Sequence, residues 1–205
     1  MRVLITAGPT REKIDPVRFI TNYSSGRMGY AIARAAVEAG HDVILVSGPV
    51  TLTRPEGIKE FYSVESAAEM AEKVFELFPA VDAAVMVAAV ADYRPAEICS
   101  SKMKKSDGDL FLRLERTTDI LAGLGARKQN GQKLVGFAAE TDDLLENAQG
   151  KLERKNLDWI AANKVSDGFG SATNRVILLS RDGRRIDIET SDKLTVARKI
   201  IETVF

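Results

Sequence analysis

The chain has 205 residues, 45% of them hydrophobic and 28% charged, and its 29 basic residues balance its 29 acidic ones. This length suits a single domain that buries its own core, and the zero net charge gives no electrostatic reason to expect a nucleic acid or a membrane as partner. One cysteine and one histidine exclude an internal disulfide and a Cys/His zinc site.

Three features of the sequence predict a cytoplasmic protein. The longest apolar run, residues 83–91, has about half the length of a membrane span. The apolar start of the chain is interrupted at Gly8 and Pro9, too early for a signal peptide, and the lone Cys99 suits a reducing compartment. Nothing around His41 suggests a catalytic triad, so we expect this histidine to be structural.

The first half of the chain alternates apolar strands with amphipathic helices. Residues 26–39 carry apolar side chains at spacings of three and four, and we expect Ser24 or Ser25 to cap this helix and Gly40 to end it. Residues 81–90 are nearly all apolar, which is typical of a central parallel strand covered on both faces. The expected strands are residues 2–7, 43–46, 61–63 and 81–90, and the expected helices are residues 26–39 and 65–78.

The second half continues the alternation after one long polar stretch. Residues 110–115 alternate in polarity as a half-exposed strand does, and Asp107-Gly108 before them is a hairpin-turn signal. In the expected helix over residues 141–155, four apolar side chains are predicted to share the buried face: Leu144, Leu145, Ala148 and Leu152. The other expected elements are strands at residues 134–138, 158–162 and 175–180, and helices at residues 118–129 and 191–204.

This alternation predicts one α/β domain over residues 1–205, with a Rossmann-like, doubly wound and mostly parallel sheet. A flap over about residues 93–113 and a hairpin are expected as insertions. Sheets of this kind bind ligands beyond the carboxyl ends of their strands. The loops that follow the strands are therefore the expected place for a site.

The start of the helix over residues 26–39 is a candidate anion site. Ser24, Ser25 and the unpaired amides of the first turn would face an anion, and Gly26 allows close approach. The plainer alternative is a capped helix with packing glycines. A dinucleotide site is disfavoured, because residues 8–25 separate these glycines from the strand and the second strand ends without an acid. None of the tyrosines begins the Tyr-x-x-x-Lys pair of a short-chain dehydrogenase.

Three later segments offer groups for a nucleotide, each with a plainer alternative. Asp92 follows the central strand, where it would hold a sugar hydroxyl, a base amine or a metal ion, or else cap a turn. Lys102 opens a basic run that forms either a lid over a polyphosphate or a solvated face. Phe137 either stacks on a base or packs in the core. Lys151 and Lys155 share one helical face, which exposure alone would explain.

Together these segments resemble the phosphopantothenoylcysteine synthetase family, the ligases of coenzyme A biosynthesis, in the same order and over most of the chain. Thr118 departs from the family pattern, in which a proline is expected. The matching segments are residues 5–12, 15–18, 22–29, 88–94, 102–105, 136–141 and 155–158.

The resemblance implies a two-step ligation in the bacterial, CTP-dependent form. The carboxylate of 4′-phosphopantothenate attacks the α-phosphate of CTP, giving an acyl-cytidylate and pyrophosphate, and the amine of cysteine then displaces CMP. Such a reaction depends on positioning and charge stabilisation without a covalent nucleophile. The sequence does not choose between CTP and ATP. Mg²⁺ is expected with the triphosphate, and no ligands for it are assigned.

The same resemblance assigns residues to each substrate. Asn22 would hold the acyl intermediate for the second step, Arg18 would contact the pantothenoyl phosphate or the intermediate, and Lys102 would contact the triphosphate. The other expected nucleotide contacts are Met86, Val87, Ala88, Asp92, Thr118, Asp119, Ile120, Leu121, Phe137, Lys151 and Lys155. Phosphopantothenate would lie against Arg18, Asn22, Ser24, Ser25, Gly26 and Ala89.

Topology opposes two of these assignments. A helix that follows a parallel strand runs away from the carboxyl edge of the sheet, so Lys151 and Lys155, late in the helix over residues 141–155, are expected to be distant from it.

The resemblance also implies partners. We expect small-molecule substrates (4′-phosphopantothenate, cysteine and CTP), a homodimer, and a fusion or association with a phosphopantothenoylcysteine decarboxylase, with no nucleic acid or membrane partner. The sequence leaves open whether this chain is a stand-alone synthetase or one domain of a bifunctional protein. Two alternative functions are an NAD(P)-dependent reductase on a Rossmann-like sheet and a non-catalytic nucleotide-binding protein.

Overall fold

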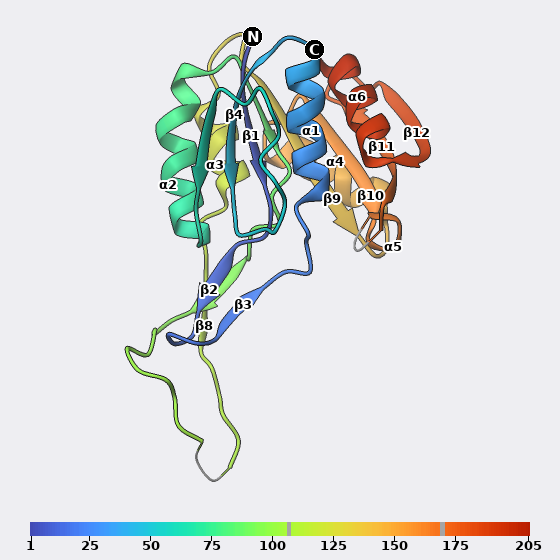
Figure 1. Cartoon of the computed structure of the whole chain (residues 1–205). Coiled ribbons are helices and arrows are strands. Elements are labelled where there is room, and N and C mark those ends of the chain that lie inside the picture. The colour runs from blue at the N-terminus through green and yellow to red at the C-terminus, as the bar shows by residue number, and fades with distance from the viewer. Residues whose placement is uncertain (106–107, 169–170) are drawn as a thin grey trace.

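The computed structural model describes residues 1–105, 108–168 and 171–205, which form a layered α/β body and an arm that projects from it (Figure 1). The described strands of the body form one sheet in the order β12-β11-β10-β9-β6-β1-β4-β5. Neighbours from β10 to β5 are parallel, whereas β11 and β12 pair antiparallel. The predicted doubly wound, mostly parallel sheet is therefore confirmed. Its strands are β1 (Arg2–Ala7), β4 (Asp42–Ser47), β5 (Glu60–Ser63), β6 (Ala83–Met86), β9 (Lys133–Glu140), β10 (Trp159–Lys164), β11 (Thr173–Ser180) and β12 (Arg185–Asp192).

Helices cover both faces of the sheet. Side chains of α1 and α6 pack on one face with Val3 and Ile5, whereas those of α2, α3 and α4 pack on the other face with Leu4. Successive side chains of a strand point to opposite faces, so β1 contributes to both cores. The helices are α1 (Arg27–Glu38), α2 (Ala67–Leu77), the short 3₁₀ helix η1 (Phe78–Ala80), α3 (Ile120–Arg127), α4 (Leu144–Arg154), α5 (Val165–Gly168) and α6 (Lys193–Val204).

The antiparallel edge contains a strand that the sequence analysis did not predict. β12 spans Arg185–Asp192, so the last helix begins at Lys193, later than expected. Ile186 and Ile188 are its two large apolar residues, too few for a recognisable alternation. The side chain of Asp192 then caps the first turn of α6, accepting hydrogen bonds from two backbone amides at 3.0 Å.

The arm is built from two short hairpins, of which the sequence indicated only the second, through the Asp107-Gly108 turn signal. β2 (Arg11–Lys13) pairs with β3 (Phe19–Thr21), and β7 (Tyr93–Pro95) pairs with β8 (Leu114–Arg116). Strands of three residues are too short to show a period, which explains why β2, β3 and β7 were missed. The arm leaves the body at the carboxyl ends of the parallel strands, and the segment between β7 and β8 reaches furthest from the sheet (Figure 1).

The strand predicted at residues 110–115 is wrong in its extent. Only residues 114 and 115 belong to β8, and residues 110–113 lie outside any strand. Leu110 and Phe111 are 56% and 88% exposed, so their apolar side chains mark an uncovered surface of the arm and not the inner face of a sheet. The predicted turn at Asp107-Gly108 lies partly outside the described residues.

The central strand is shorter than the predicted span of residues 81–90. β6 ends at Met86, because Thr6 Oγ1 accepts hydrogen bonds from the next two backbone amides at 3.1 and 3.2 Å. The chain then crosses toward β1, where the Ala89 amide donates to the Gly8 carbonyl at 2.9 Å. The residues that follow Met86 therefore form a loop over the carboxyl edge of the sheet.

Two predicted helix details are also wrong. Neither Ser24 nor Ser25 caps α1, whose N-cap is Gly26 with a φ of 77°, a left-handed conformation that favours glycine. Ser24 Oγ instead accepts a hydrogen bond from the Gly26 amide at 3.3 Å. The fourth helix begins at Leu144, and Leu145, predicted on its buried face, is 40% exposed because the buried stripe follows the neighbouring i, i+4 positions.

Gly29 allows α1 to lie directly on β1. A Cβ at this position would lie 2.5 Å from the Cβ of Ala7 and 2.9 Å from its Cα. We therefore expect Gly29→Ala to lower the free energy of unfolding by about 1–3 kcal/mol, the usual cost of overpacking, as measured by urea denaturation. Arg34→Ala on the exposed face of α1 is the control, with an expected change below about 0.5 kcal/mol. Equal effects of the two substitutions would contradict this account of the contact.

Candidate functional site

The candidate site lies at the carboxyl ends of β1 and β6, where the winding of the sheet changes direction. From β1 the chain adds β4 and β5 on one side, and it then returns through α2 to place β6 on the other side. Crevices at such switch points bind ligands in open α/β sheets. The loops after β1 and β6 and the base of the arm meet at this edge (Figure 1).

Most residues predicted to bind the nucleotide line one cavity of about 440 Å³, the first cavity. It lies between the loop after β6, the start of α3 and one face of α4. The predicted residues that line it are Met86, Ala88, Asp92, Thr118, Asp119, Ile120, Leu121, Phe137, Lys151 and Lys155. Val87 lines the adjoining cavity instead, and Lys102 lines neither.

The second cavity, of about 300 Å³, adjoins the first. Its lining includes all but one of the residues predicted to bind phosphopantothenate, namely Asn22, Ser24, Ser25, Gly26 and Ala89. The missing residue is Arg18. The two cavities have common walls, because Ala88, Val90, Asp92, Phe137 and Lys151 line both. Ligands in the two cavities would therefore lie side by side.

Lys151 and Lys155 do reach the carboxyl edge, contrary to the expectation from topology. β6 ends at Met86, opposite Gly136, whereas β9 continues to Glu140, so α4 starts well beyond the edge and returns along it. A helix rises about 1.5 Å per residue and a strand about 3.3 Å, so about seven helical residues recover only three strand residues. Lys151 Nζ accordingly donates to the Phe137 carbonyl at 2.7 Å.

The two lysines of the first cavity differ in their electrostatic surroundings. Burial lowers the pKa of Lys151, and the neighbouring Lys155 cation lowers it further. Lys155 is paired with Asp119, with 2.8 Å between Nζ and Oδ2. Burial opposes the ionisation of Asp119, but hydrogen bonds from Lys155 and from the Ala122 amide outweigh it and lower the pKa of this carboxyl. An anion in this cavity would therefore meet a desolvated ammonium group beside an ion pair.

Asn22 lies in the second cavity at the base of the arm. Its Nδ2 donates to the carbonyl of Ala89 at 2.9 Å, and the Thr10 amide donates to the same carbonyl at 3.2 Å. These bonds tie the loop after β1 to the loop after β6. The orientation of the Asn22 side chain is thus set by the backbone of Ala89, which lines the second cavity between two residues that line both.

Arg18 and Lys102 lie together on the arm, where they line a third cavity of about 670 Å³. Asp15 holds this part of the arm together, because its Oδ2 accepts hydrogen bonds from Arg18 Nε at 2.9 Å and from the Met103 amide at 3.1 Å. The hydrogen bond from the Arg18 guanidinium outweighs burial and lowers the pKa of Asp15 well below its usual range. The carboxylate therefore stays charged throughout the neutral pH range.

The structure does not bring Lys102 and Asn22 together within one chain. Arg18 precedes β3 and Asn22 follows it, so an extended segment of about 13 Å separates them. The cavity that Lys102 and Arg18 line shares no residue with the two cavities at the sheet edge. The predicted catalytic set is therefore divided between the edge of the sheet and the arm.

Several polar residues of the cavities were missed by the sequence analysis: Arg27, Tyr93 and residues 116–117 lie within two positions of predicted residues, whereas the others come from elements far from them in the chain. Asn163 and Lys164 end β10, whose other residues are all apolar, a signal that would have identified Asn163 as a residue of the carboxyl edge. Lys193 is only 9% exposed, and burial together with the Arg27 cation lowers its pKa. The missed polar residues are Thr6, Tyr93, Arg116 and Thr117 in the first cavity, and Arg27, Asn163, Asn174 and Lys193 in the second.

None of the helices in residues 1–105, 108–168 and 171–205 combines the length and the apolar character that crossing a membrane requires. In the same residues, no three His, Cys, Asp or Glu side chains gather as they would around a metal ion held by the protein alone.

Comparison with known proteins gives one consistent result. The family described as "DNA/pantothenate metabolism flavoprotein C-terminal domain" matches residues 1–205. The coenzyme A biosynthesis bifunctional protein CoaBC of Bacillus subtilis (strain 168) is 51% identical over 205 residues, which cover 98% of this chain and 50% of that protein. A cysteine/cysteine sulfinic acid decarboxylase of an unknown prokaryotic organism is 48% identical over 206 residues, 99% of this chain and 57% of that protein.

The fold is shared with a solved structure. The crystal structure of the C-terminal domain of a CoaBC protein superposes with a TM-score of 0.85 at 46% sequence identity, covering 99% of this chain and 93% of that one. The chain spans about half the length of the curated relatives that it matches.

Proposed function

Because this chain belongs to the family of C-terminal domains of DNA/pantothenate metabolism flavoproteins, we propose that it joins 4′-phosphopantothenate to L-cysteine at the expense of a nucleoside triphosphate, with CTP favoured. The observation that carries the proposal is the pair of adjoining cavities at the sheet edge. The residues expected around the nucleotide line one, and those expected around the acid line the other. A simple nucleotide sensor would not require the second cavity, and a dinucleotide-dependent reductase is disfavoured because β4 ends without the acid that binds a ribose.

The nucleotide would occupy the first cavity, whose volume of about 440 Å³ lies in the range of small-molecule sites. Phe137 lines this cavity and would stack on the base, and the ammonium group of Lys151 would supply a positive charge there. The ion pair between Lys155 and Asp119 forms the wall of this cavity at the start of α3. These groups would orient the α-phosphate toward the wall that the two cavities share.

The acid would occupy the second cavity, with its phosphate at the start of α1. The free amides of this helix and the nearby Arg27 and Lys193 supply positive charge for a phosphate. Its carboxylate would then face the shared wall at Ala88 and Asp92. In the first step a carboxylate oxygen attacks the α-phosphorus, the bond to the β-phosphate breaks, and pyrophosphate leaves as the acyl-cytidylate forms.

Asn22 would act in the second step. Its amide is held next to the shared wall by the bond to the Ala89 carbonyl, so it would lie beside the acyl group when cysteine arrives. The amine of cysteine attacks the acyl carbon, CMP leaves, and the amine loses a proton as the amide forms. Holding the acyl-cytidylate in line for this attack is the role that we propose for Asn22.

Mg²⁺ would enter with the triphosphate. This ion is typically bound through one or two carboxylates together with substrate phosphates. Asp92 and Asp119 are the carboxylates that line the first cavity, and Asp119 is already paired with Lys155. Asp92 therefore fits best as the carboxylate facing Mg²⁺, which would neutralise phosphate charge.

A second copy of the chain would supply Lys102 and Arg18. The arm exposes apolar side chains that a monomer would leave in water, including Phe19 at 43%, Leu110 at 56% and Phe111 at 88%. In a symmetric dimer each arm would cover these surfaces and reach the partner's cavities. The divided catalytic set would then be reunited across the interface, with Lys102 over the triphosphate.

The proposed first step is tested by pyrophosphate release. We expect release from CTP to require 4′-phosphopantothenate and to occur without cysteine, and CMP to appear only when cysteine is added. Running the assay with CTP and with ATP decides which nucleotide is used. If neither nucleotide gives pyrophosphate in the presence of the acid, the ligase proposal is wrong.

The setting of the reaction follows from the relatives. These substrates are soluble metabolites, so we propose a cytoplasmic enzyme. We also propose that it acts in coenzyme A biosynthesis with a phosphopantothenoylcysteine decarboxylase, either fused to it or associated with it. The support is that a close relative is named a bifunctional protein of that pathway and is about twice the matched length.

A further inference from the structure

The end of α4 carries an asparagine at a position whose backbone suits glycine. Asn156 has a φ of 54°, in the left-handed region. Its backbone amide donates to the Glu153 carbonyl at 3.2 Å, and the backbone amide of Leu157 donates to the Leu152 carbonyl at 3.0 Å. These bonds define the helix-ending motif in which glycine is the usual residue. An asparagine there accepts some backbone strain, which points to a task for its side chain.

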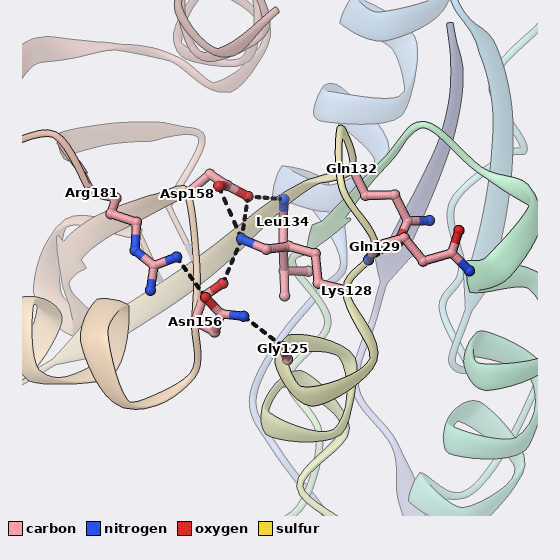
Figure 2. A network of polar contacts seen from close by, with 8 residues as sticks. All are labelled: Gly125, Lys128, Gln129, Gln132, Leu134, Asn156, Asp158 and Arg181. Atoms are coloured by element: carbon pink, nitrogen blue, oxygen red, sulfur yellow. Dashed lines mark hydrogen bonds and ion pairs between the residues drawn. The ribbon is translucent and has the colours of Figure 1, made fainter.

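The side chain of Asn156 ties α4 to α3 and to the loop after β11 (Figure 2). Its Nδ2 donates to the Gly125 carbonyl of α3 at 2.7 Å, and its Oδ1 accepts from Arg181 Nη1 at 2.6 Å. The two helices meet here backbone to backbone, because a Cβ on Gly125 would lie 2.0 Å from the Lys155 carbonyl oxygen. The amide of Asn156 therefore sets the position of α3 against the end of α4.

This contact is connected to the wall of the first cavity through Lys155 and through α3. Lys155 immediately precedes Asn156, and its side chain runs along α3 to Asp119, with 2.8 Å between Nζ and Oδ2. Asp119 in turn caps α3 by accepting the Ala122 amide at 3.0 Å. The backbone of Lys155 is thus held against Gly125, and its side chain forms with Asp119 an ion pair that lines the cavity.

We propose that Asn156, which does not line either cavity at the sheet edge, is a positioning residue for nucleotide binding. It acts through Lys155, by holding the base of that side chain where its ammonium group meets Asp119 and the nucleotide. This inference rests on the function proposed above and adds to it a residue outside the site. Without the Asn156 side chain, α3 and the end of α4 shift relative to each other, and the cavity wall loses its shape.

The rest of the network in Figure 2 has a different task. Lys128 is bonded to both carboxylate oxygens of Asp158 at 3.0 Å and to the Asn156 carbonyl at 2.8 Å, and Asp158 Oδ2 accepts the Leu134 amide at 2.7 Å. These bonds join the loop after α3 to the starts of β9 and β10, at the edge opposite the cavities. They stabilise the fold, whereas the Asn156–Gly125 bond is directed at the α3–α4 contact.

The test is Asn156→Gly, which keeps the left-handed backbone and removes both side-chain bonds. Titration calorimetry with CTP and Mg²⁺ is expected to show a Kd about five times higher than that of the unmodified protein, the size of one lost hydrogen bond. Because glycine suits this backbone, the melting temperature should fall no more than in Gln132→Ala. That control loses a side-chain amide that donates to the carbonyls of Phe78 and Val81 at 2.9 and 2.8 Å and makes no bond to α4, and its Kd for CTP should not change.

A double substitution shows whether Asn156 acts through Lys155. In a Lys155→Ala background, adding Asn156→Gly is expected to change the Kd for CTP by less than twofold. Additive effects would overturn the inference, as would an unchanged Kd in Asn156→Gly alone. If the unmodified protein binds neither CTP nor ATP, the proposed function itself fails and this inference with it, an outcome distinct from the other two.

Discussion

Replacing Lys102 with glutamine is expected to slow formation of the acyl-nucleotide by about 100- to 1000-fold. The residue lies on the arm, and in the proposed dimer its ammonium group meets the triphosphate of the partner's nucleotide. Losing one charge contact to a transition state typically costs about 2.7–4 kcal/mol, which corresponds to this range. Single-turnover pyrophosphate release from CTP with 4′-phosphopantothenate measures the step. Lys199→Gln, an exposed lysine of α6, is the matched control and should keep the normal rate.

A mixing experiment decides which chain supplies Lys102. Lys102→Gln and an inactive Asn22 variant, each nearly inactive alone, are unfolded together and refolded as a mixture. If the site combines Asn22 of one chain with Lys102 of the other, half of the dimers are mixed and each has one intact site, so about a quarter of full activity returns. If the mixture stays inactive although mixed dimers have formed, Lys102 acts within its own chain and the proposed sharing of the arm is wrong.

Asn22→Asp is expected to separate the two steps of the reaction. The amide that donates to the Ala89 carbonyl becomes a carboxylate oxygen, which repels both that carbonyl and the charged intermediate. Complete turnover should fall by about 100-fold, the size of effect seen when a positioned donor at a reacting carbonyl is lost. The first step does not require the Asn22 amide in this proposal and should still give about one pyrophosphate per site, so acyl-cytidylate accumulates and is detected by mass spectrometry after acid quench.

The control for this variant is Asn147→Asp on the exposed side of α4. Its Nδ2 also donates to a backbone carbonyl, that of Asp142 at 3.1 Å, but it lies outside both cavities at the sheet edge. Normal turnover is expected. If Asn22→Asp turns over normally, or blocks pyrophosphate release as strongly as product formation, Asn22 has no separate role in the second step.

The fold class and the two groups of site residues could be predicted because their signals are local. The buried strands and amphipathic helices follow from the spacing of apolar side chains over a few residues. The carboxyl ends of parallel strands meet at one edge, so Asp92 and Phe137 were expected together and line one cavity. The assignment of substrates to these groups came from the family resemblance, and it stays a proposal for this chain.

Sequence alone thus determined the alternation of strands and helices, the mostly parallel sheet and the edge at which a site forms, since each depends on periodicity and on chain order. Tertiary structure alone decided that Thr6 ends β6 early and that the length of β9 brings Lys151 back to the site. It also decided that Lys102 lies on an arm away from Asn22. Each depends on a hydrogen bond, a strand length or a direction in space between residues distant in the chain, and no local pattern of side chains encodes such a relation.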